Sequence, residues 1–147
     1  MQYSPYSDME EYPRLSVCTT SCHDTSTLRG LWKEPDFDRN LYWSHAHQMS
    51  SAPDELTPPV VRNILTHVFS TNSLFCILPI QDYFALSSTL SAGNPENERI
   101  NVPGTVGGNN WTYQLPCLVD ELLKLTSLSS EIRKLVDERK RRAMWKI

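Results

Sequence analysis

The clearest pattern along the chain is a helical one near its middle. Apolar residues recur there with steps of one, three and four positions, which places them on one face of a helix; they are Val60, Val61, Ile64, Leu65, Val68 and Phe69. Thr57 before them is a suitable N-cap, and Pro58 and Pro59 fall in the first turn, where a missing N–H costs nothing. The pattern predicts an amphipathic helix that begins at Thr57.

Two other runs have the character of β-strands. Residues 15–20 are β-branched and mostly apolar, which favours a short strand. Residues 74–80 are apolar throughout and follow the helix directly, as expected of a strand buried on both faces. Between the helix and the first strand, short helices are predicted over residues 27–34, before Pro35, and around residues 40–49.

A polar pair of residues follows each predicted strand. His23–Asp24 comes after the first strand and Gln81–Asp82 after the second. The order strand, helix, strand, helix is typical of parallel α/β folds, in which binding and catalytic groups collect at the carboxyl ends of the strands. We therefore expect both pairs on the same side of one parallel sheet.

The last third of the chain has a different character. Residues 91–116 are rich in Gly, Pro and Asn, and this stretch is too long for a simple connection. Two amphipathic segments follow, a short one over residues 118–125 and a longer one over residues 130–145, whose buried side is predicted to carry Ile132, Leu135 and Val136. Two parallel strands leave open sheet edges that a stable protein normally covers, so the fold is expected to be incomplete on its own.

Composition narrows the class of protein. The 147 residues are 39% hydrophobic and 21% charged, with a net charge of −3, which is the range of soluble globular proteins and argues against a dedicated nucleic-acid binder. The basic run at residues 139–142 follows acidic residues in a helical pattern and is interpreted as a solvated helix face. No run is long and apolar enough to span a bilayer and the first residues resemble no signal peptide, so no membrane partner and a cytoplasmic location are expected.

Four cysteines raise the question of a metal site. Cys18, Cys22 and His23 are close in sequence, but no second CxxC or HxxxH pair completes a tetrahedral zinc site, and Cys76 and Cys117 stand alone. In a cytoplasmic protein disulfides are also unexpected. Neither a metal nor a cofactor is predicted.

Three longer motifs carry a family resemblance. They are SVCTTSCHDTSTLRGLW around His23–Asp24, LPIQDYFAL around Gln81–Asp82, and ERINVPGTVGGNNWTYQLP near the end. The residues of these motifs, their order and their separation along the chain resemble the late-barrel segments of 4-α-glucanotransferases, also called amylomaltases or disproportionating enzymes. The resemblance covers most of residues 15–116, and it implies the C-terminal portion of a TIM (β/α)8 barrel within an α/β fold, incomplete because a whole barrel needs about 250 residues.

The resemblance also implies site residues. The family performs retaining transfer at α-1,4-glucan bonds with an Asp nucleophile, a Glu acid/base and another Asp that stabilises the cationic transition state, and Asp24 matches this last Asp. His23 matches a residue that binds sugar hydroxyls, although a structural histidine is the alternative. Trp32 and Trp111 are candidate platforms for glucose rings, with core packing an equal alternative. The expected ligands are maltooligosaccharides or α-glucan.

Other positions receive structural roles in this interpretation. Gln81 and Asp82 are expected to hold loops at the barrel mouth. Asn101, Pro103 and Gly104 are expected to fix a turn of the tail, and Arg99 to pair with an internal carboxylate. Thr112 and Gln114 stand where many family members carry Arg.

The chain departs from the family in a way that bears on activity. No RIDH-like segment for the nucleophile and no GEDLG-like segment for the acid/base occurs in it. The leading hypothesis is that residues 1–147 are one C-terminal barrel fragment, inactive alone and joined in function to the missing N-terminal part. The alternatives are a non-catalytic glucan-binding remnant or split-barrel interaction partner, and an unrelated scaffold whose motifs are coincidental.

Overall fold

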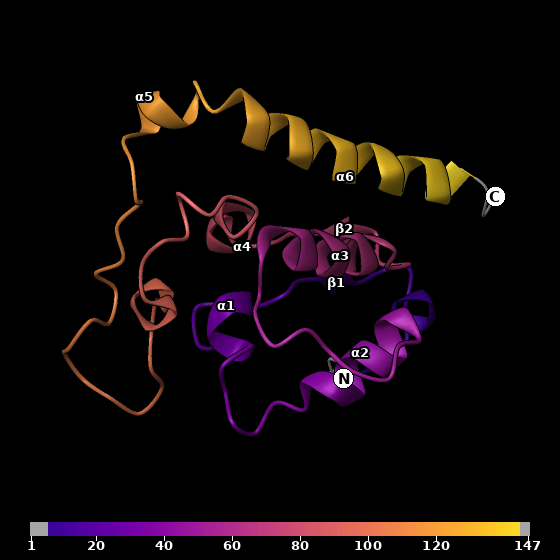
Figure 1. Ribbon diagram of the computed structural model, residues 1–147, viewed down its shortest axis with the longest axis horizontal. Helices are drawn as coiled ribbons and strands as arrows, with labels where there is room; N and C mark the ends of the chain where they lie inside the picture. Colours follow the sequence, from indigo (N-terminus) through magenta and orange to yellow (C-terminus); the bar gives the residue numbers. More distant parts are fainter. Residues whose placement is uncertain (1–5, 145–147) are drawn as a thin grey trace.

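The computed structural model describes the backbone of residues 6–144 and the side chains of residues 6–140. Along this part of the chain the elements are the 3-10 helix η1 (Met9–Glu11), strand β1 (Val17–Cys18), helices α1 (Leu28–Leu31), α2 (Arg39–His47) and α3 (Pro58–Phe69), strand β2 (Phe75–Cys76), helix α4 (Ile80–Phe84), the 3-10 helix η2 (Pro95–Glu98), and helices α5 (Val119–Leu122) and α6 (Thr126–Met144). Helix α6 lies across α3 and α4 at the top of Figure 1, and α1 and α2 lie toward the bottom.

The two strands form the parallel pair that the sequence predicts. Val17 pairs with Phe75 and Cys18 with Cys76. Backbone bonds extend the pairing on both sides, because the Leu74 N–H donates to the Arg14 carbonyl at 2.8 Å and the Ile77 N–H to the Cys18 carbonyl at 2.9 Å. The regular strands are nevertheless shorter than the predicted runs, since each strand has only one neighbour within the described residues.

The prediction that the second strand is buried on both faces is wrong for this chain. Phe75 is 56% exposed and Ile77 is 60% exposed, whereas Cys76 and Leu78, which alternate with them along the chain, pack against the core. Successive strand side chains point to opposite faces, and only one face of this sheet is covered by helices. Val17, the register partner of Phe75, is exposed on the same open face.

Helix α3 confirms the helical pattern in the middle of the chain. It begins directly after Thr57, which occupies the N-cap position without a side-chain hydrogen bond, and it buries Val61, Ile64, Leu65, Val68 and Phe69. The shorter helices α1 and α2 also lie within or beside the predicted ranges, and side-chain oxygens of Thr27 and Asp38 cap their first turns. Together α2 and α3 supply half of the residues in the buried core cluster.

Helix α6 confirms the predicted long C-terminal helix, although its predicted last residue, Trp145, lies outside the described residues. Leu135 is fully buried against the core, and Arg62 on α3 joins Glu131 at 2.8 Å and Glu138 at 2.9 Å on α6. The short segment before it, α5, leaves Leu118, Val119 and Leu123 exposed.

The basic run on α6 is only partly a solvated face. Arg139 turns inward and donates to the backbone carbonyls of Ser73 and, at 3.2 Å, Leu74, so it joins α6 to the start of β2. Lys140 remains exposed beside Asp137, and the side chains of residues 141–142 lie outside those described. None of the helices in residues 6–144 combines the length and apolar character needed to cross a membrane.

Candidate functional site

The site begins with the loop that leaves the first strand. We call residues 19–27, between β1 and α1, the His23–Asp24 loop. Thr20 near its start donates a hydrogen bond to one carboxylate oxygen of Asp82, and the backbone N–H of Leu28 just after its end donates to the other oxygen at 2.8 Å. One buried side chain therefore holds both ends of the loop.

This arrangement settles where the two polar pairs lie. Asp82 follows β2 and Thr20 follows β1, and their side chains meet, so His23–Asp24 and Gln81–Asp82 lie at the carboxyl ends of the parallel strands as predicted. The structure places Gln81 and Asp82 inside helix α4, where the sequence pattern indicated only a strand end. Both are buried, so neither offers its side chain to a ligand in solution.

Asp82 lies in an unusual electrostatic environment for a carboxylate. Its side chain is 0% exposed, and this burial raises its pKa from 3.8 to about 6, against the lowering effect of the bonds from Thr20 and Leu28. The nearby carboxylate of Glu98 also raises the pKa. Burial disfavours the ionised form, whereas hydrogen bonds to the carboxylate favour it.

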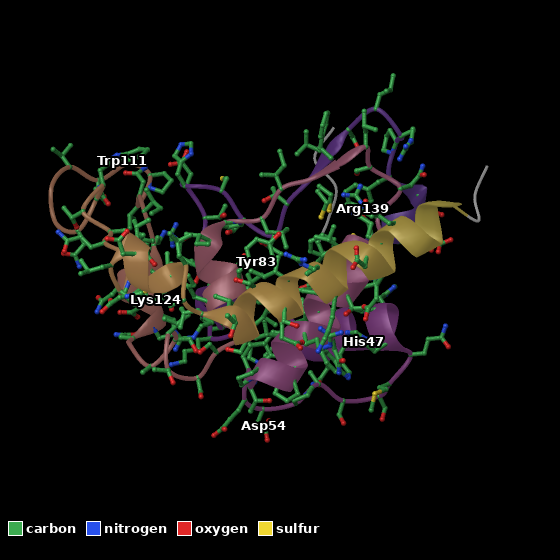
Figure 2. The ribbon with its side chains drawn as sticks, turned by 90° about the horizontal axis from the view of Figure 1, so that it is seen from above. His47, Asp54, Tyr83, Trp111, Lys124 and Arg139 are labelled. Carbon is green, nitrogen blue, oxygen red and sulfur yellow. The ribbon has the colours of Figure 1, made fainter. Side chains whose placement is uncertain are left out.

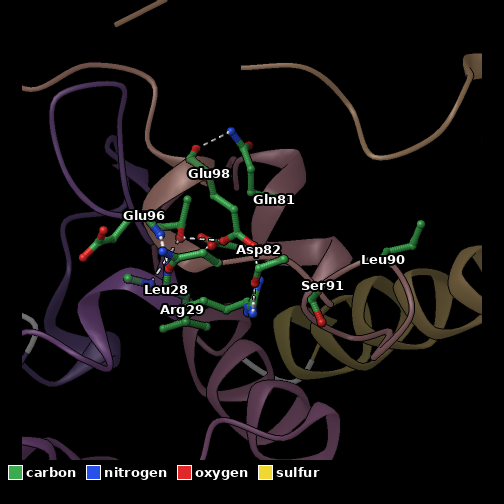
Figure 3. Close-up of polar contacts among 12 residues, drawn as sticks. Leu28, Arg29, Gln81, Asp82, Leu90, Ser91, Glu96 and Glu98 are labelled. Atoms are coloured by element: carbon green, nitrogen blue, oxygen red, sulfur yellow. Dashed lines mark hydrogen bonds and ion pairs between the residues drawn. The ribbon is translucent and has the colours of Figure 1, made fainter. Parts of the chain in front are cut away.

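Glu98 connects the same region to the second half of the chain, as Figure 3 shows. Its carboxylate pairs with Arg29 on α1 and accepts a hydrogen bond from the Thr27 hydroxyl at 2.9 Å. Its backbone carbonyl accepts from the Gln81 side chain at 3.3 Å. Three elements, α1, α4 and η2, are thus joined beneath the His23–Asp24 loop.

The Asp24 carboxylate is held from the other side by the distal loop, which we define as residues 99–111. The Asn101 side-chain amide donates to Asp24 Oδ1 at 2.7 Å, and the Asn101 backbone N–H donates to the His23 carbonyl at 3.0 Å. The Asp24 side chain remains 46% exposed, and its Oδ2 lies 3.4 Å from His23 Nε2. One oxygen of the carboxylate is therefore fixed by protein while the side chain stays accessible.

Arg99 corrects one expectation. It was predicted to pair with an internal carboxylate, but its guanidinium donates to the backbone carbonyls of Asp24 and Asn101, both at 3.0 Å, and to the Ser26 hydroxyl at 3.2 Å. The reason is position, because the carboxylate nearest in sequence, Glu98, is already paired with Arg29. Arg99 fastens the backbone of the His23–Asp24 loop rather than neutralising an acid.

Trp111 completes the exposed part of the site. Its indole is 5.3 Å from the His23 imidazole between ring centroids, tilted by 35°, and the residue is 67% exposed. Its backbone has a φ of +62°, and its N–H donates to the Ile100 carbonyl at 2.7 Å. Figure 2 shows it at the far end of the molecule from Arg139.

The predicted turn in the distal loop is present and sets this position. Gly104 has a φ of +77°, a conformation that glycine adopts without strain, and the Thr105 N–H closes the turn on the Val102 carbonyl at 3.3 Å. The Asn110 side chain accepts from the Val102 N–H at 3.0 Å. Because the chain reverses at this turn, Trp111 lies next to His23.

Trp32, the second tryptophan predicted to contact a sugar, lies in the core and not beside His23. It is 3% exposed and packs edge-on against Tyr42 and Trp43, with Phe37 beside it. It also borders a cavity of about 520 Å³, lined by residues of α1, of the start of α2 and of the loops around them, among them Arg29, Lys33, Phe37 and Arg39. A ring with so little exposed surface favours the core-packing alternative over a sugar platform.

Taken together, the site contains a half-exposed carboxylate, an exposed imidazole and an exposed indole. A carboxylate accepts hydrogen bonds, a neutral imidazole can both donate and accept, and an indole offers a flat apolar face with one N–H. This combination suits a ligand that is rich in hydroxyl groups and has apolar ring faces.

Sequence reasoning missed the role of Asn101, whose only signal was its place before the Pro103–Gly104 turn.

Comparison with known proteins gives a consistent picture. The family model described as 4-alpha-glucanotransferase matches residues 1–120. The chain is 35% identical over 132 residues to a 4-alpha-glucanotransferase of Chlamydia trachomatis, covering 88% of this chain and 24% of the relative. It is 32% identical over 127 residues to the rice protein 4-alpha-glucanotransferase DPE2, covering 86% of this chain and 13% of the relative.

A solved structure supports the fold. The amylomaltase from Streptococcus agalactiae in complex with acarbose aligns with a TM-score of 0.62 at 20% identity, over 88% of this chain and 22% of that one. The chain thus spans about a quarter of the length of the bacterial relatives that it matches.

The environment of Asp82 predicts how stability depends on pH. The unfolded chain releases this proton near pH 4, whereas the folded chain keeps it until about pH 6, so the folded state binds more protons in this window. Stability should therefore fall as the pH rises through the window, by on the order of 3 kcal/mol if the full shift is realised. In Asp82→Asn this part of the pH dependence should disappear, as measured by urea unfolding at several pH values.

Asp120→Asn, at an exposed position, is the matched control and should follow the parent protein. If Asp82→Asn and the parent showed parallel stability curves between about pH 4 and pH 6, Asp82 would not be the buried carboxyl described above.

Proposed function

Because the chain belongs to the 4-alpha-glucanotransferase family, whose model matches residues 1–120, we propose that it is the part of a cytoplasmic α-1,4-glucan transferase that supplies the transition-state-stabilising carboxylate, Asp24. In this proposal the two parallel strands and their helices are the last section of a (β/α)8 barrel. The expected substrates are maltooligosaccharides or α-glucan. The observation that carries the proposal is the half-exposed Asp24 carboxylate, fixed by Asn101 at the carboxyl end of β1.

The role of Asp24 follows from the chemistry of retaining glycoside transfer. One carboxylate attacks the anomeric carbon, a second carboxyl protonates the departing oxygen, and the transition state has oxocarbenium character. A third carboxylate stabilises this transition state when it remains ionised and accepts hydrogen bonds from sugar hydroxyls that strengthen as positive charge develops. Asn101 donates to Asp24 Oδ1, which fixes that oxygen and leaves Oδ2 for such hydroxyls.

His23 and Trp111 fit substrate contacts beside this carboxylate. The imidazole is exposed, its Nε2 is 3.4 Å from Asp24 Oδ2, and the indole of Trp111 lies against it. A sugar ring that reached Asp24 would meet both side chains. We propose that His23 binds hydroxyl groups of that sugar and that Trp111 contacts an apolar ring face.

Two groups needed for bond making and breaking must come from elsewhere. The nucleophile and the acid/base of the family belong to RIDH-like and GEDLG-like segments that do not occur in these 147 residues. We propose that they are supplied by the remainder of a complete barrel, and that residues 1–147 alone do not catalyse transfer.

A second candidate is supported by the open face of the sheet. Leu15, Val17, Phe75 and Ile77 are exposed there, although strand residues of this type are normally covered. Both strands also have a free edge within the described residues. These features favour a split-barrel interaction partner, which is a chain that binds complementary strands. The non-catalytic glucan-binding remnant is a separate alternative.

Activity measurements on the 147-residue chain bear on both candidates. Purified alone, it should release no glucose from maltotriose, since it has neither nucleophile nor acid/base. Calorimetric titration with maltooligosaccharides should be run on the same sample, because binding without turnover would support the glucan-binding alternative. Glucose release that disappeared in Asp24→Asn would show that the catalytic set is assigned wrongly.

In the complete barrel, Asp24→Asn should abolish transfer and leave substrate binding largely intact. The substitution keeps the size and much of the hydrogen bonding but removes a charge that matters most when the anomeric centre becomes cationic. Loss of such a contact costs about 3 kcal/mol of barrier or more, on the order of a hundredfold or more in rate. His23→Ala should be milder and should raise KM as well, because its contacts are shared by the ground and transition states.

The kinetic comparison needs a control that changes an acid away from the site. Asp36→Asn, at an exposed position, should leave kcat and KM unchanged. Near-normal turnover by Asp24→Asn would make Asp24 a structural loop residue and would remove the basis of the proposed role.

A further inference from the structure

Two cysteines face each other across the parallel strands, outside the site described above. Cys18 and Cys76 are direct register partners, and neither is in a disulfide. Neighbouring strands lie about 4.8 Å apart, which is within the roughly 4.4–6.8 Å separation of Cα atoms that a disulfide spans. Their side chains point to the helix-covered face, opposite Val17 and Phe75, where Cys18 belongs to the core and Cys76 packs at its border.

The surroundings of the pair favour a reactive thiolate. The hydrogen bond from the Cys76 thiol lowers the pKa of Cys18 to about 7, and the Thr71 hydroxyl and the charge of Arg139 act in the same direction, while burial opposes them. The same hydrogen bond raises the pKa of Cys76, with burial adding to the effect. The first proton is therefore lost easily and the second is retained between the two sulfurs.

Arg139 is the cation that acts on this pair, and backbone contacts hold it in place. Its guanidinium donates to the carbonyls of Ser73 and Leu74, directly before β2, so its charge cannot swing freely into solvent. A fixed cation beside a thiol is the usual setting of a cysteine that reacts at neutral pH. Exposure also differs within the pair, because Cys18 is buried and Cys76 is half-buried.

We propose that Cys18 and Cys76 form a reversible cross-strand disulfide by exchange with a low-molecular-weight disulfide such as oxidised glutathione. The proton held between the two sulfurs first moves to Cys18, and the more exposed Cys76 sulfur, now a thiolate, attacks one sulfur of the oxidant and releases one small thiol, which leaves a mixed disulfide on Cys76. Cys18 then loses this proton, and its thiolate attacks the Cys76 sulfur and releases the second small thiol. Two protein thiols lose two electrons and two protons, and one small disulfide becomes two thiols.

The bond would act on the strands that carry the site. Cys18 is two residues before Thr20, and Cys76 is six residues before Asp82, so the disulfide closes the same strand pair that the Thr20–Asp82 contact joins. The modification concerns the strands themselves and does not depend on the activity proposed above.

The test is a redox titration of the full chain in glutathione buffers at neutral pH, with acid quenching, alkylation of free thiols and peptide mapping by mass spectrometry. The Cys18–Cys76 bridge should be the dominant disulfide, and reduction with dithiothreitol should restore both thiols. Its equilibrium constant should exceed that of the same bridge in the urea-unfolded chain by at least about tenfold, because the fold holds the sulfurs together.

Three variants make the result specific. Cys22→Ser combined with Cys117→Ser removes the two other thiols and should keep the bridge unchanged. Cys18→Ser should instead accumulate glutathione on Cys76, and Cys76→Ser should form no bridge to Cys18. Equal equilibrium constants with and without urea, a different dominant pairing, or a persistent mixed disulfide on Cys76 of the parent chain would each overturn the proposal.

Discussion

A buried carboxylate with two donors organises this part of the molecule. Asp82 is fully buried. Burial of a neutral polar group without hydrogen-bond partners costs on the order of 2–7 kcal/mol, and burial of an ionised carboxylate without partners costs far more. Thr20 and the Leu28 N–H supply those partners from the two ends of the His23–Asp24 loop. The Leu28 N–H has no acceptor within its own helix, because the first turn of a helix leaves its N–H donors without intrahelical partners. The Asp82 carboxylate thus accepts from an N–H in the first turn of α1, closes the His23–Asp24 loop and joins the segments that follow both strands.

The candidate site depends on segments that are far apart in the sequence. The loop that carries His23 and Asp24 is held from below by α4 and from the side by Asn101 of the distal loop. Arg99 and Glu98 extend this support to Ser26, Thr27 and Arg29. Such a network keeps a half-exposed carboxylate in one orientation, which is the requirement for stabilising charge that appears only in a transition state.

The local sequence pattern predicted where the helices and strands lie better than it predicted which of their side chains are covered or in contact. The spacing of Val61, Ile64 and Leu65 defines α3, because a helix periodicity is local, and the parallel pairing of the strands followed from the order of elements. The exposure of Phe75 could not be predicted, since it depends on which layers cover the sheet. The contact of Asn101 with Asp24 joins residues 77 positions apart and has no local signal. Trp32 shows the same limit, because an indole suits a core and a sugar site equally well until its neighbours are known.

Hydrogen exchange at the Leu28 amide tests the central claim, that the buried Asp82 carboxylate holds the His23–Asp24 loop. As the first residue of α1, Leu28 has no helical acceptor, so its protection depends on Asp82. The account predicts that this amide exchanges at least about a hundredfold more slowly than that of the exposed loop residue Gly107, approaching the amides of the α3 core. Exchange of Leu28 at the rate of Gly107 would contradict it.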